Sequence, residues 1–203
     1  MDTQPTALVV MAHHRADSLT AALARRAADR LDAAGYRVDF LDLHREGFDP
    51  RNRVEDEPDY GNREKRYSDE VHGYAEPLLA ADLVAIVFPV WWFGLPALLK
   101  GWIDRVWNYG LTYGRREKPM AGKRILWLGL AGLAEDDPDS ALTRALLDGA
   151  LRRGIAEFCD VTEVHTQALF DTEAKGLEGA ARERHYAALF ARADDAVGKL
   201  LAG

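Results

Sequence analysis

The sequence is poor in cysteine, because Cys159 is the only one among 203 residues. A single cysteine cannot form an internal disulfide, so the expected compartment is the reducing cytoplasm. The N-terminal stretch MDTQPTALVVMAHH lacks the basic segment and the long apolar segment of a signal peptide. Pro89, Gly94 and Pro96 interrupt the longest apolar run, residues 83–99, so no stretch has the continuity of a membrane span. We therefore expect a cytoplasmic protein.

Positive charge is also scarce. The chain has 26 Lys and Arg residues against 33 Asp and Glu residues, a net charge of −7, which argues against a nucleic-acid partner. Neither G-x-G-x-x-G nor G-x-x-x-x-G-K-[ST] occurs, so the dinucleotide fingerprint and the P-loop are both excluded. Hydrophobic residues make up 48% of the chain, which excludes a disordered protein. Without repeats or linkers, residues 1–203 are expected to form one domain.

Metal-ligand patterns are missing as well. His13 and His14 are adjacent, but no cysteine or carboxylate stands at a ligand spacing from them. The acidic cluster at 135–139 lacks the EF-hand pattern and is expected to start a helix. We expect His165 to be structural and Cys159 to be buried, without a neighbour in sequence that would activate its thiol. No metal site is predicted.

The apolar pattern alternates between strands and helices along the chain. Apolar or alternating runs predict strands at 7–11, 37–43, 83–90, 124–130 and 161–169. Helices are predicted from Ser18 to Gly35 and at 67–81, 97–107, 139–153 and 176–201. The charged segment 45–66 is expected to be a long excursion with room for one helical turn. Strands that alternate with helices predict an open, doubly wound α/β sheet.

Ligands of such sheets bind outside the carboxyl ends of the strands, where the strand order reverses. This rule directs attention to three loops, AHHRADSLT (12–20), PVWWFGLP (89–96) and GLAGLAED (129–136). They follow the first, third and fourth predicted strands. Together they are the candidate site.

The first loop leads into a helix N-terminus, where free N–H groups and the helix dipole favour an anion. Ser18 and Thr20 add hydroxyl donors, and His13, His14 and Arg15 add positive charge. The alternative is that Ser18 only caps the helix and that the basic residues are solvated. This loop alone does not decide between the two interpretations.

The second loop is an aromatic elbow in which Trp91, Trp92 and Phe93 stand side by side. Flat rings and exposed amides at the end of a central strand suit a flat heterocycle such as an isoalloxazine. Backbone N–H groups there would stabilise the charge that develops on its N5 and O4 edge during reduction. The alternative is an oligomer interface, where tryptophan is also enriched. In the third loop, the small residues of 129–132 allow a ligand to approach the backbone closely, although many such stretches are simple turns.

The stretch FPVWWFGLPALLKGWIDRVWNYGLTYG (88–114) resembles the signature of the flavodoxin-like NAD(P)H:quinone reductases. This family includes DT-diaphorase, the modulator-of-drug-activity reductases and the ancillary reductases of potassium-efflux channels. ALVVMAHHRADSLTAAL (7–23), LDLHREGFDP (41–50) and GIAEFCDVTEV (154–164) are similar to other segments of the family. The resemblance implies a five-stranded parallel sheet of order 2-1-3-4-5 with helices on both faces. It also implies a homodimer with the site at the subunit interface.

The resemblance assigns roles by position. It places the flavin phosphate and ribityl groups on His13, Ser18, Leu19 and Thr20. The isoalloxazine would be held by Pro89, Val90, Trp91, Trp92 and Phe93, and by the loop Gly129, Leu130, Ala131 and Gly132. Tyr113 matches a tyrosine that lines the substrate pocket from the second subunit in mammalian relatives, and it is the candidate for orienting the acceptor.

The chain departs from the family pattern in four respects. The third loop reads GLAG where the family usually has two threonines and two glycines, and Leu19 replaces a common phenylalanine. The mammalian proton-relay histidine has no match, because EDDPDSALTR (135–144) occupies that region. The C-terminus is also short, without the mammalian extension.

The resemblance implies a flavin-dependent NAD(P)H oxidoreductase that reduces quinones or similar flat acceptors by two-electron ping-pong hydride transfer. FAD or FMN would be the cofactor, with FAD slightly favoured because the excursion 45–66 offers a groove for an adenylate. Three alternatives stay open: a one-electron flavodoxin-type carrier, a regulatory subunit that docks on a membrane transporter, and a flavin-free scaffold whose elbow is only a dimer contact.

Overall fold

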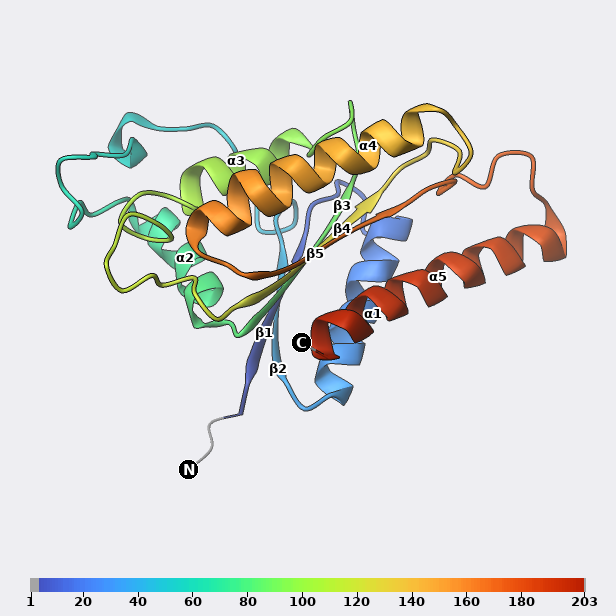
Figure 1. Cartoon of the computed structure of the whole chain (residues 1–203), viewed down its shortest axis with the longest axis horizontal. Coiled ribbons are helices and arrows are strands. Elements are labelled where there is room, and N and C mark those ends of the chain that lie inside the picture. Colours follow the sequence, from blue (N-terminus) through green and yellow to red (C-terminus); the bar gives the residue numbers. More distant parts are fainter. Residues whose placement is uncertain (1–3, 203) are drawn as a thin grey trace.

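The computed structural model describes residues 4–202, which fold around a sheet of five parallel strands in the order β2-β1-β3-β4-β5 (Figure 1). The strands are β1 (Thr6–Met11), β2 (Arg37–Asp42), β3 (Leu83–Pro89), β4 (Arg124–Leu130) and β5 (Glu163–Leu169). The helices are α1 (Leu19–Ala33), α2 (Asp69–Ala80), α3 (Ala97–Val106), α4 (Asp139–Leu147) and α5 (Gly179–Ala202). Strand order and parallel pairing confirm the predicted fold class.

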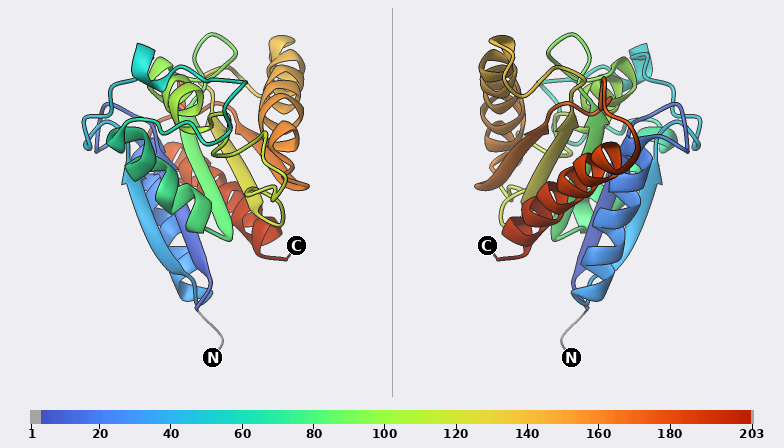
Figure 2. Two further views of the ribbon diagram at one scale, coloured as in Figure 1. Left: turned by 90° about the vertical axis from the view of Figure 1, so that its left-hand side faces the viewer. Right: turned by 90° about the vertical axis from the view of Figure 1, so that its right-hand side faces the viewer.

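Helices cover both faces of the sheet. Helices α1 and α5 pack on one face, and α2, α3 and α4 lie on the other (Figure 2). Every residue of β3 is buried, as a central parallel strand requires, and side chains alternate between the two cores along it. The all-apolar sequence of this strand, LVAIVFP, follows from that double burial.

Helix α1 begins and ends as the sequence predicts. The Ser18 hydroxyl accepts a hydrogen bond from the N–H of Ala21 at 3.1 Å, so Ser18 is the N-cap. At the other end Gly35 has a φ of +92°, and the N–H of Tyr36 bonds back to the carbonyl of Leu31. A residue with a side chain would be strained at that φ, which explains the glycine.

Two helices have features that the sequence pattern did not reveal. Ser68 caps α2, whose bounds lie within two residues of the predicted 67–81, and Pro77 lies inside the helix without ending it. The helix predicted to end at residue 153 continues beyond α4 through π-helical turns at Asp148–Ala156 and a short 3-10 segment at Glu157–Cys159. Periodicity over 139–153 could not reveal this change of winding, because π-helical and α-helical turns bury similar faces.

The excursion 45–66 crosses over α3 and contains one 3-10 turn, η1 (Val54–Asp56), which confirms the expected single turn. It rests directly on α3: an added Cβ at Gly101 would lie 2.3 Å from the Cβ of Pro50. Glycine is therefore required where the two segments cross. None of the helices in 4–202 is long and apolar enough to span a bilayer.

Candidate functional site

The loops after β1, β3 and β4 meet at one edge of the sheet. They enclose a cavity of about 210 Å³, which we call the sheet-edge pocket. Its lining is His13, Ser18, Leu19, Thr20, Pro89, Val90, Trp91, Leu130, Gly132, Thr172 and Glu173. The rule that ligands bind at the carboxyl ends of parallel strands thus places most of the predicted residues together.

One half of this pocket is the N-terminus of α1. The N–H groups of Leu19 and Thr20 have no hydrogen-bond acceptor within residues 4–202, as expected for a first helical turn. Asp17 forms an ion pair with Arg15 at 2.9 Å, which offsets the negative charge beside the pocket. These free donors and the positive end of the helix dipole make this half suited to an anion.

His13 lines the same half, and its surroundings favour the neutral ring. Its Nδ1 accepts a hydrogen bond from the N–H of Arg15 at 3.0 Å, so the neutral ring carries its proton on Nε2. Burial, and then repulsion from the stacked ring of His14 at 4.6 Å, lower the pKa of His13 from its ordinary value. In its neutral form the ring therefore offers Nε2–H as a hydrogen-bond donor toward the pocket.

The aromatic elbow is a tight, strained turn. Trp91 and Gly94 exchange two backbone hydrogen bonds, and Trp92 and Phe93 between them have φ angles of +51° and +60°. Two consecutive bulky residues in the left-handed region cost free energy that surrounding contacts must supply. The turn leaves the Trp92 side chain 98% exposed at its tip, and the N–H groups of Trp92 and Phe93 have no acceptor within the described chain.

Beside the elbow lies a second hollow, the elbow pocket, lined by Val90, Trp92, Phe93, Ala131, Gly132, Leu133 and Thr143. Gly132 belongs to both pockets, and an added Cβ there would lie 2.7 Å from Oε1 of Glu173. Gly129 lines neither pocket. It lies within β4, where an added Cβ would approach Cγ2 of Val90 to 2.9 Å, so its role is to let the elbow pack against the sheet.

Sequence reasoning missed the loop after β5. Thr172 and Glu173 line the sheet-edge pocket, and backbone hydrogen bonds from Thr172 to Ala131 and from Asp171 to Leu133 join this loop to the loop after β4. The fifth strand pairs with β4 in register, so its carboxyl end reaches the same edge. That adjacency was available from the predicted strand order and would have identified both residues.

Tyr113 lies in a different cavity of about 300 Å³, the aromatic pocket. Its lining is Asn52, Pro58, Tyr60, Ile103, Asp104, Trp107, Asn108, Tyr113, Gly154, Ile155, Phe158 and Cys159. It shares no lining residue with the sheet-edge pocket. Helix α3 separates them: the elbow precedes its first residue, Tyr113 follows its last, and its ten residues span about 15 Å. A single chain therefore does not bring Tyr113 to the elbow.

The aromatic pocket is suited to a flat, neutral molecule. The ring of Tyr113 lies 5.1 Å from that of Phe158 and 5.7 Å from that of Tyr109. Burial, and then its hydrogen bond with Tyr60, raise the pKa of Tyr113, so the phenol keeps its proton. Cys159 is buried, as predicted, and burial raises the pKa of its thiol to about 11, which leaves it a poor nucleophile.

The donor set fits a flavin better than a metal ion. Within residues 4–202 no group of three or more His, Cys, Asp or Glu side chains is arranged to hold a metal. By contrast, free N–H groups at the α1 N-terminus suit a phosphate, and the unpaired amides of Trp92 and Phe93 suit the polar edge of a flat ring. Gly132 lies between these two halves, and its lack of a side chain leaves space there.

A doubly wound parallel sheet with an anion-binding helix N-terminus and an aromatic elbow at its carboxyl edge defines the flavodoxin-like class of proteins. The model of the flavodoxin-like fold family matches residues 5–193, and the chain belongs to this family.

Curated relatives and solved structures agree with this membership. The chain is 47% identical over 124 residues to the uncharacterized NAD(P)H oxidoreductase YcaK of Escherichia coli, and 37% identical over 122 residues to NAD(P)H dehydrogenase [quinone] 1 of Rattus norvegicus. These matches cover 61% and 53% of this chain, but only 63% and 44% of the relatives, so the chain spans less than two thirds of their length.

Among solved structures, the NAD(P)H:quinone oxidoreductase of Methanothermobacter marburgensis has a TM-score of 0.80 at 23% identity, covering 99% of this chain and 98% of that one. General stress protein 14 of Treponema denticola, solved in complex with FMN, has a TM-score of 0.62 at 21% identity, covering 98% and 99%. At these identities the likeness shows the fold.

Proposed function

We propose that this protein is a flavin-dependent NAD(P)H oxidoreductase that reduces quinones or similar flat acceptors. The observation that carries the proposal is the sheet-edge pocket, where the donors of the α1 N-terminus stand beside the aromatic elbow. The proposal is supported by the relatives, since the E. coli protein is named an NAD(P)H oxidoreductase and the rat protein an NAD(P)H dehydrogenase that acts on quinone. A bound flavin would supply two-electron hydride transfer, from NAD(P)H and then to the acceptor, in ping-pong order.

The chain's own residues would bind and orient the reactants. The first-turn amides of α1 would hold the flavin phosphate, with His13 donating from Nε2. Ser18 caps this turn, and its hydroxyl, which here donates to the carbonyl of Arg15 at 2.9 Å, would turn toward the phosphate. The amides of Trp92 and Phe93 would bind the ring edge on which negative charge grows during reduction. Indole and phenyl faces would stack nicotinamide and acceptor in turn, which explains why no separate nucleotide motif occurs in the sequence.

We further propose a homodimer in which the aromatic pocket of one subunit faces the elbow of the other. This arrangement is supported by the separation of Tyr113 from the sheet-edge pocket within one chain. It is also supported by apolar residues that are exposed in the single chain along α4 and the 3-10 segment after it: Leu142, Leu146 and Phe158, 48%, 46% and 64% exposed. In this dimer Tyr113 would orient the acceptor.

FAD is the first candidate cofactor and FMN the second. The excursion 45–66 lines the aromatic pocket and not the sheet-edge pocket, so within one chain it offers no groove for an adenylate. In the proposed dimer, the partner's excursion would lie beside the flavin site and supply that groove. We also propose a cytoplasmic location, because the single cysteine is buried and reduced.

The test is chromatography of flavin released by acid from purified protein, followed by reconstitution with FMN or FAD. We expect yellow protein with one flavin per chain and NAD(P)H oxidation that depends on a naphthoquinone. Ser18→Asp is the matched variant, because aspartate still caps α1 but places a carboxylate where the phosphate would bind. Protein that neither carries flavin nor binds it on reconstitution would refute the proposal.

A further inference from the structure

Arg105 is the most completely buried charged residue of the aromatic-pocket side of the molecule, with no exposed side-chain surface. It lies on α3 and reaches two places in the excursion and the first turn of α2. One guanidinium nitrogen donates to the carbonyl of Asp49 at 2.6 Å, and another donates to Oδ2 of Asp56 at 2.9 Å and to Oε2 of Glu70 at 2.7 Å. The guanidinium also lies 5.3 Å from the ring centre of Phe48.

Asp56, which receives one of these bonds, is itself fixed from other directions. Its carboxylate accepts hydrogen bonds from the N–H and the hydroxyl of Ser68, at 2.8 and 3.0 Å. Its backbone carbonyl accepts one from the side-chain amide of Asn108 at 2.9 Å. Both oxygens of the Asp56 carboxylate therefore have hydrogen-bond donors inside the protein.

Arg105 consequently holds both ends of the segment 49–56. The segment is also seated on the same helix, because Pro50 packs on Gly101 one turn before Arg105. Contact at Gly101 sets the height of the segment above α3, and the guanidinium bonds set its position along the helix. We call Arg105, Asp56 and Glu70 the excursion clamp.

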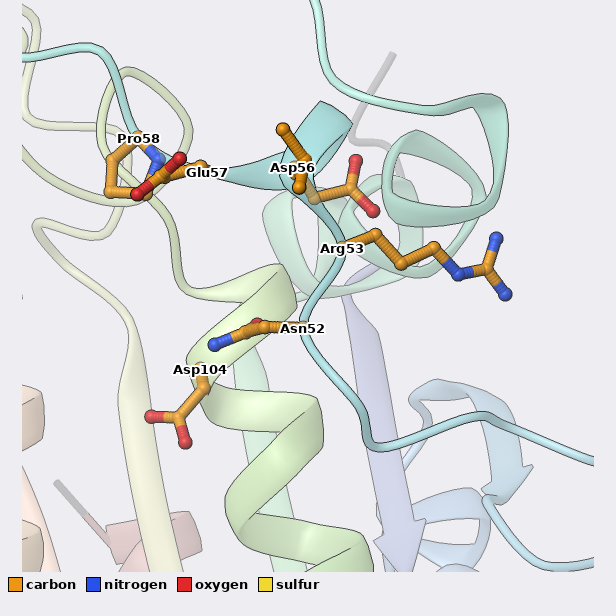
Figure 3. Close-up of a pocket in the computed structure, with 7 residues that line it drawn as sticks. Asn52, Arg53, Asp56, Glu57, Pro58 and Asp104 are labelled. Carbon is orange, nitrogen blue, oxygen red and sulfur yellow. The ribbon is translucent and has the colours of Figure 1, made fainter.

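The clamped segment leads directly into one wall of the aromatic pocket. Asn52 lies within it, and Pro58 and Tyr60 follow it. In the adjoining hollow of about 390 Å³, Asn52 and Asp104 point to one side, whereas the Arg53 side chain points to the other (Figure 3). Arg105 lines neither cavity, so it does not contact a molecule bound in them.

Stability alone does not account for this cluster. A buried ion pair is worth little compared with apolar residues of the same volume, because desolvation opposes the attraction between the charges. The donors of a guanidinium are fixed in one plane, so they fix the positions of the groups that accept their hydrogen bonds relative to one another. The cluster thus specifies where the wall of the aromatic pocket stands.

We infer that Arg105 is a positioning residue that, through Asp49 and Asp56, holds the excursion wall of the aromatic pocket and so sets the affinity for flat acceptors. The inference rests on the proposed function for the identity of the ligand. The contacts that carry it do not depend on a bound flavin.

The test compares Arg105→Lys and Asp56→Asn with the wild-type protein, each reconstituted with FMN, which has no adenylate for the excursion to hold. Lysine keeps the charge but not the fork, and asparagine keeps the size but not the charge. For 2-methyl-1,4-naphthoquinone we expect KM to rise about tenfold in both variants. Flavin content and turnover with ferricyanide, which needs no stacking pocket, are expected to stay at the wild-type level. Arg26→Met is the control, because it removes an ion pair with Asp194 on the opposite face of the sheet.

Two further measurements need no activity. Trypsin should cut after Arg51 or Arg53 faster in both variants than in the wild type and the control, as mapped by mass spectrometry. Quenching of protein fluorescence by the same naphthoquinone should show weaker binding, because Trp107 and Tyr113 line the pocket. If Arg105→Lys does not fold, the milder Asp56→Asn decides the question by the same measurements.

The outcomes separate the two proposals. Protein without flavin would refute the proposed function, whereas proteolysis and quenching would still report on the clamp. Unchanged KM and quenching in folded variants would overturn the inference, even if proteolysis became faster. Equal losses of flavin, ferricyanide turnover and naphthoquinone turnover would also overturn it, since they would indicate a general structural role.

Discussion

At the scale of single residues, the state of His13 decides how the anion-binding half of the site responds to pH. Because burial and His14 lower its pKa, protons favour the unfolded chain as the pH falls through about 6.5, the ordinary histidine value. The contribution of His13 to stability is thus present above that pH and is lost below it. A phosphate beside the ring would act in the opposite direction and raise the pKa.

We predict that His14→Gln raises the pKa of His13 in the flavin-free protein, because it removes the neighbouring positive charge that opposes protonation. NMR titration of the imidazole carbon-bound protons measures the shift directly. His44→Gln, in the turn after β2, is the control and should leave the His13 titration where it was. A His13 pKa that does not move would show that burial alone sets it.

The elbow shows how local strain and function compete at two positions. Turns with positive φ at both central residues favour Asn-Gly, whereas this one has Trp92-Phe93. We predict that the double variant Trp92→Asn, Phe93→Gly is more stable to urea by about 1 kcal/mol. It should also bind flavin more weakly, by fluorescence titration, because the rings are gone. An unchanged or lower unfolding midpoint would refute the strain argument.

At the scale of secondary structure, the crossing of the excursion over α3 depends on one glycine. We predict that Gly101→Ala destabilises the protein by roughly 1–3 kcal/mol, because the new methyl group would meet the backbone of Pro50. Urea unfolding monitored by tryptophan fluorescence measures the change. Gly149→Ala is the control, since nothing lies within 4 Å of its added Cβ, and it should be neutral or stabilising. Equal effects of the two substitutions would contradict the packing argument.

The bounds of helices and strands could be predicted where the local apolar pattern determines them. The path of a segment could not be predicted where contacts with residues distant in sequence determine it. The bounds of β3 and α3 differ by one residue from those predicted, because burial on two faces or on one stripe leaves a readable pattern. The path of the excursion is fixed instead by contacts such as that of Arg105 with Asp56, 49 residues away. Nothing in the local sequence of 45–66 encodes its partner.

At the scale of the whole molecule, the site was predictable to the extent that it follows from sheet topology. The loops after β1, β3 and β4 meet as the strand order requires, and the same rule extends to the overlooked Glu173. The position of Tyr113 does not follow from topology, because within one chain Tyr113 and the sheet-edge pocket belong to different cavities. In the proposed dimer its relation to the site would depend on how the two chains associate, and this makes the dimer open to a direct test.

If each site combines the elbow of one subunit with the aromatic pocket of the other, two defective variants should complement each other. Ser18→Asp would damage only the anion-binding half, and Tyr113→Leu only the acceptor half. When the two are unfolded together, mixed in equal amounts and refolded with flavin, about half of the dimers are mixed by statistics. Each mixed dimer has one site with both halves intact, so about one quarter of wild-type naphthoquinone reduction should return. Each variant refolded alone is the control and should stay near its own low activity. If every site belonged to a single chain, mixing would restore nothing, because each subunit would keep its own defect.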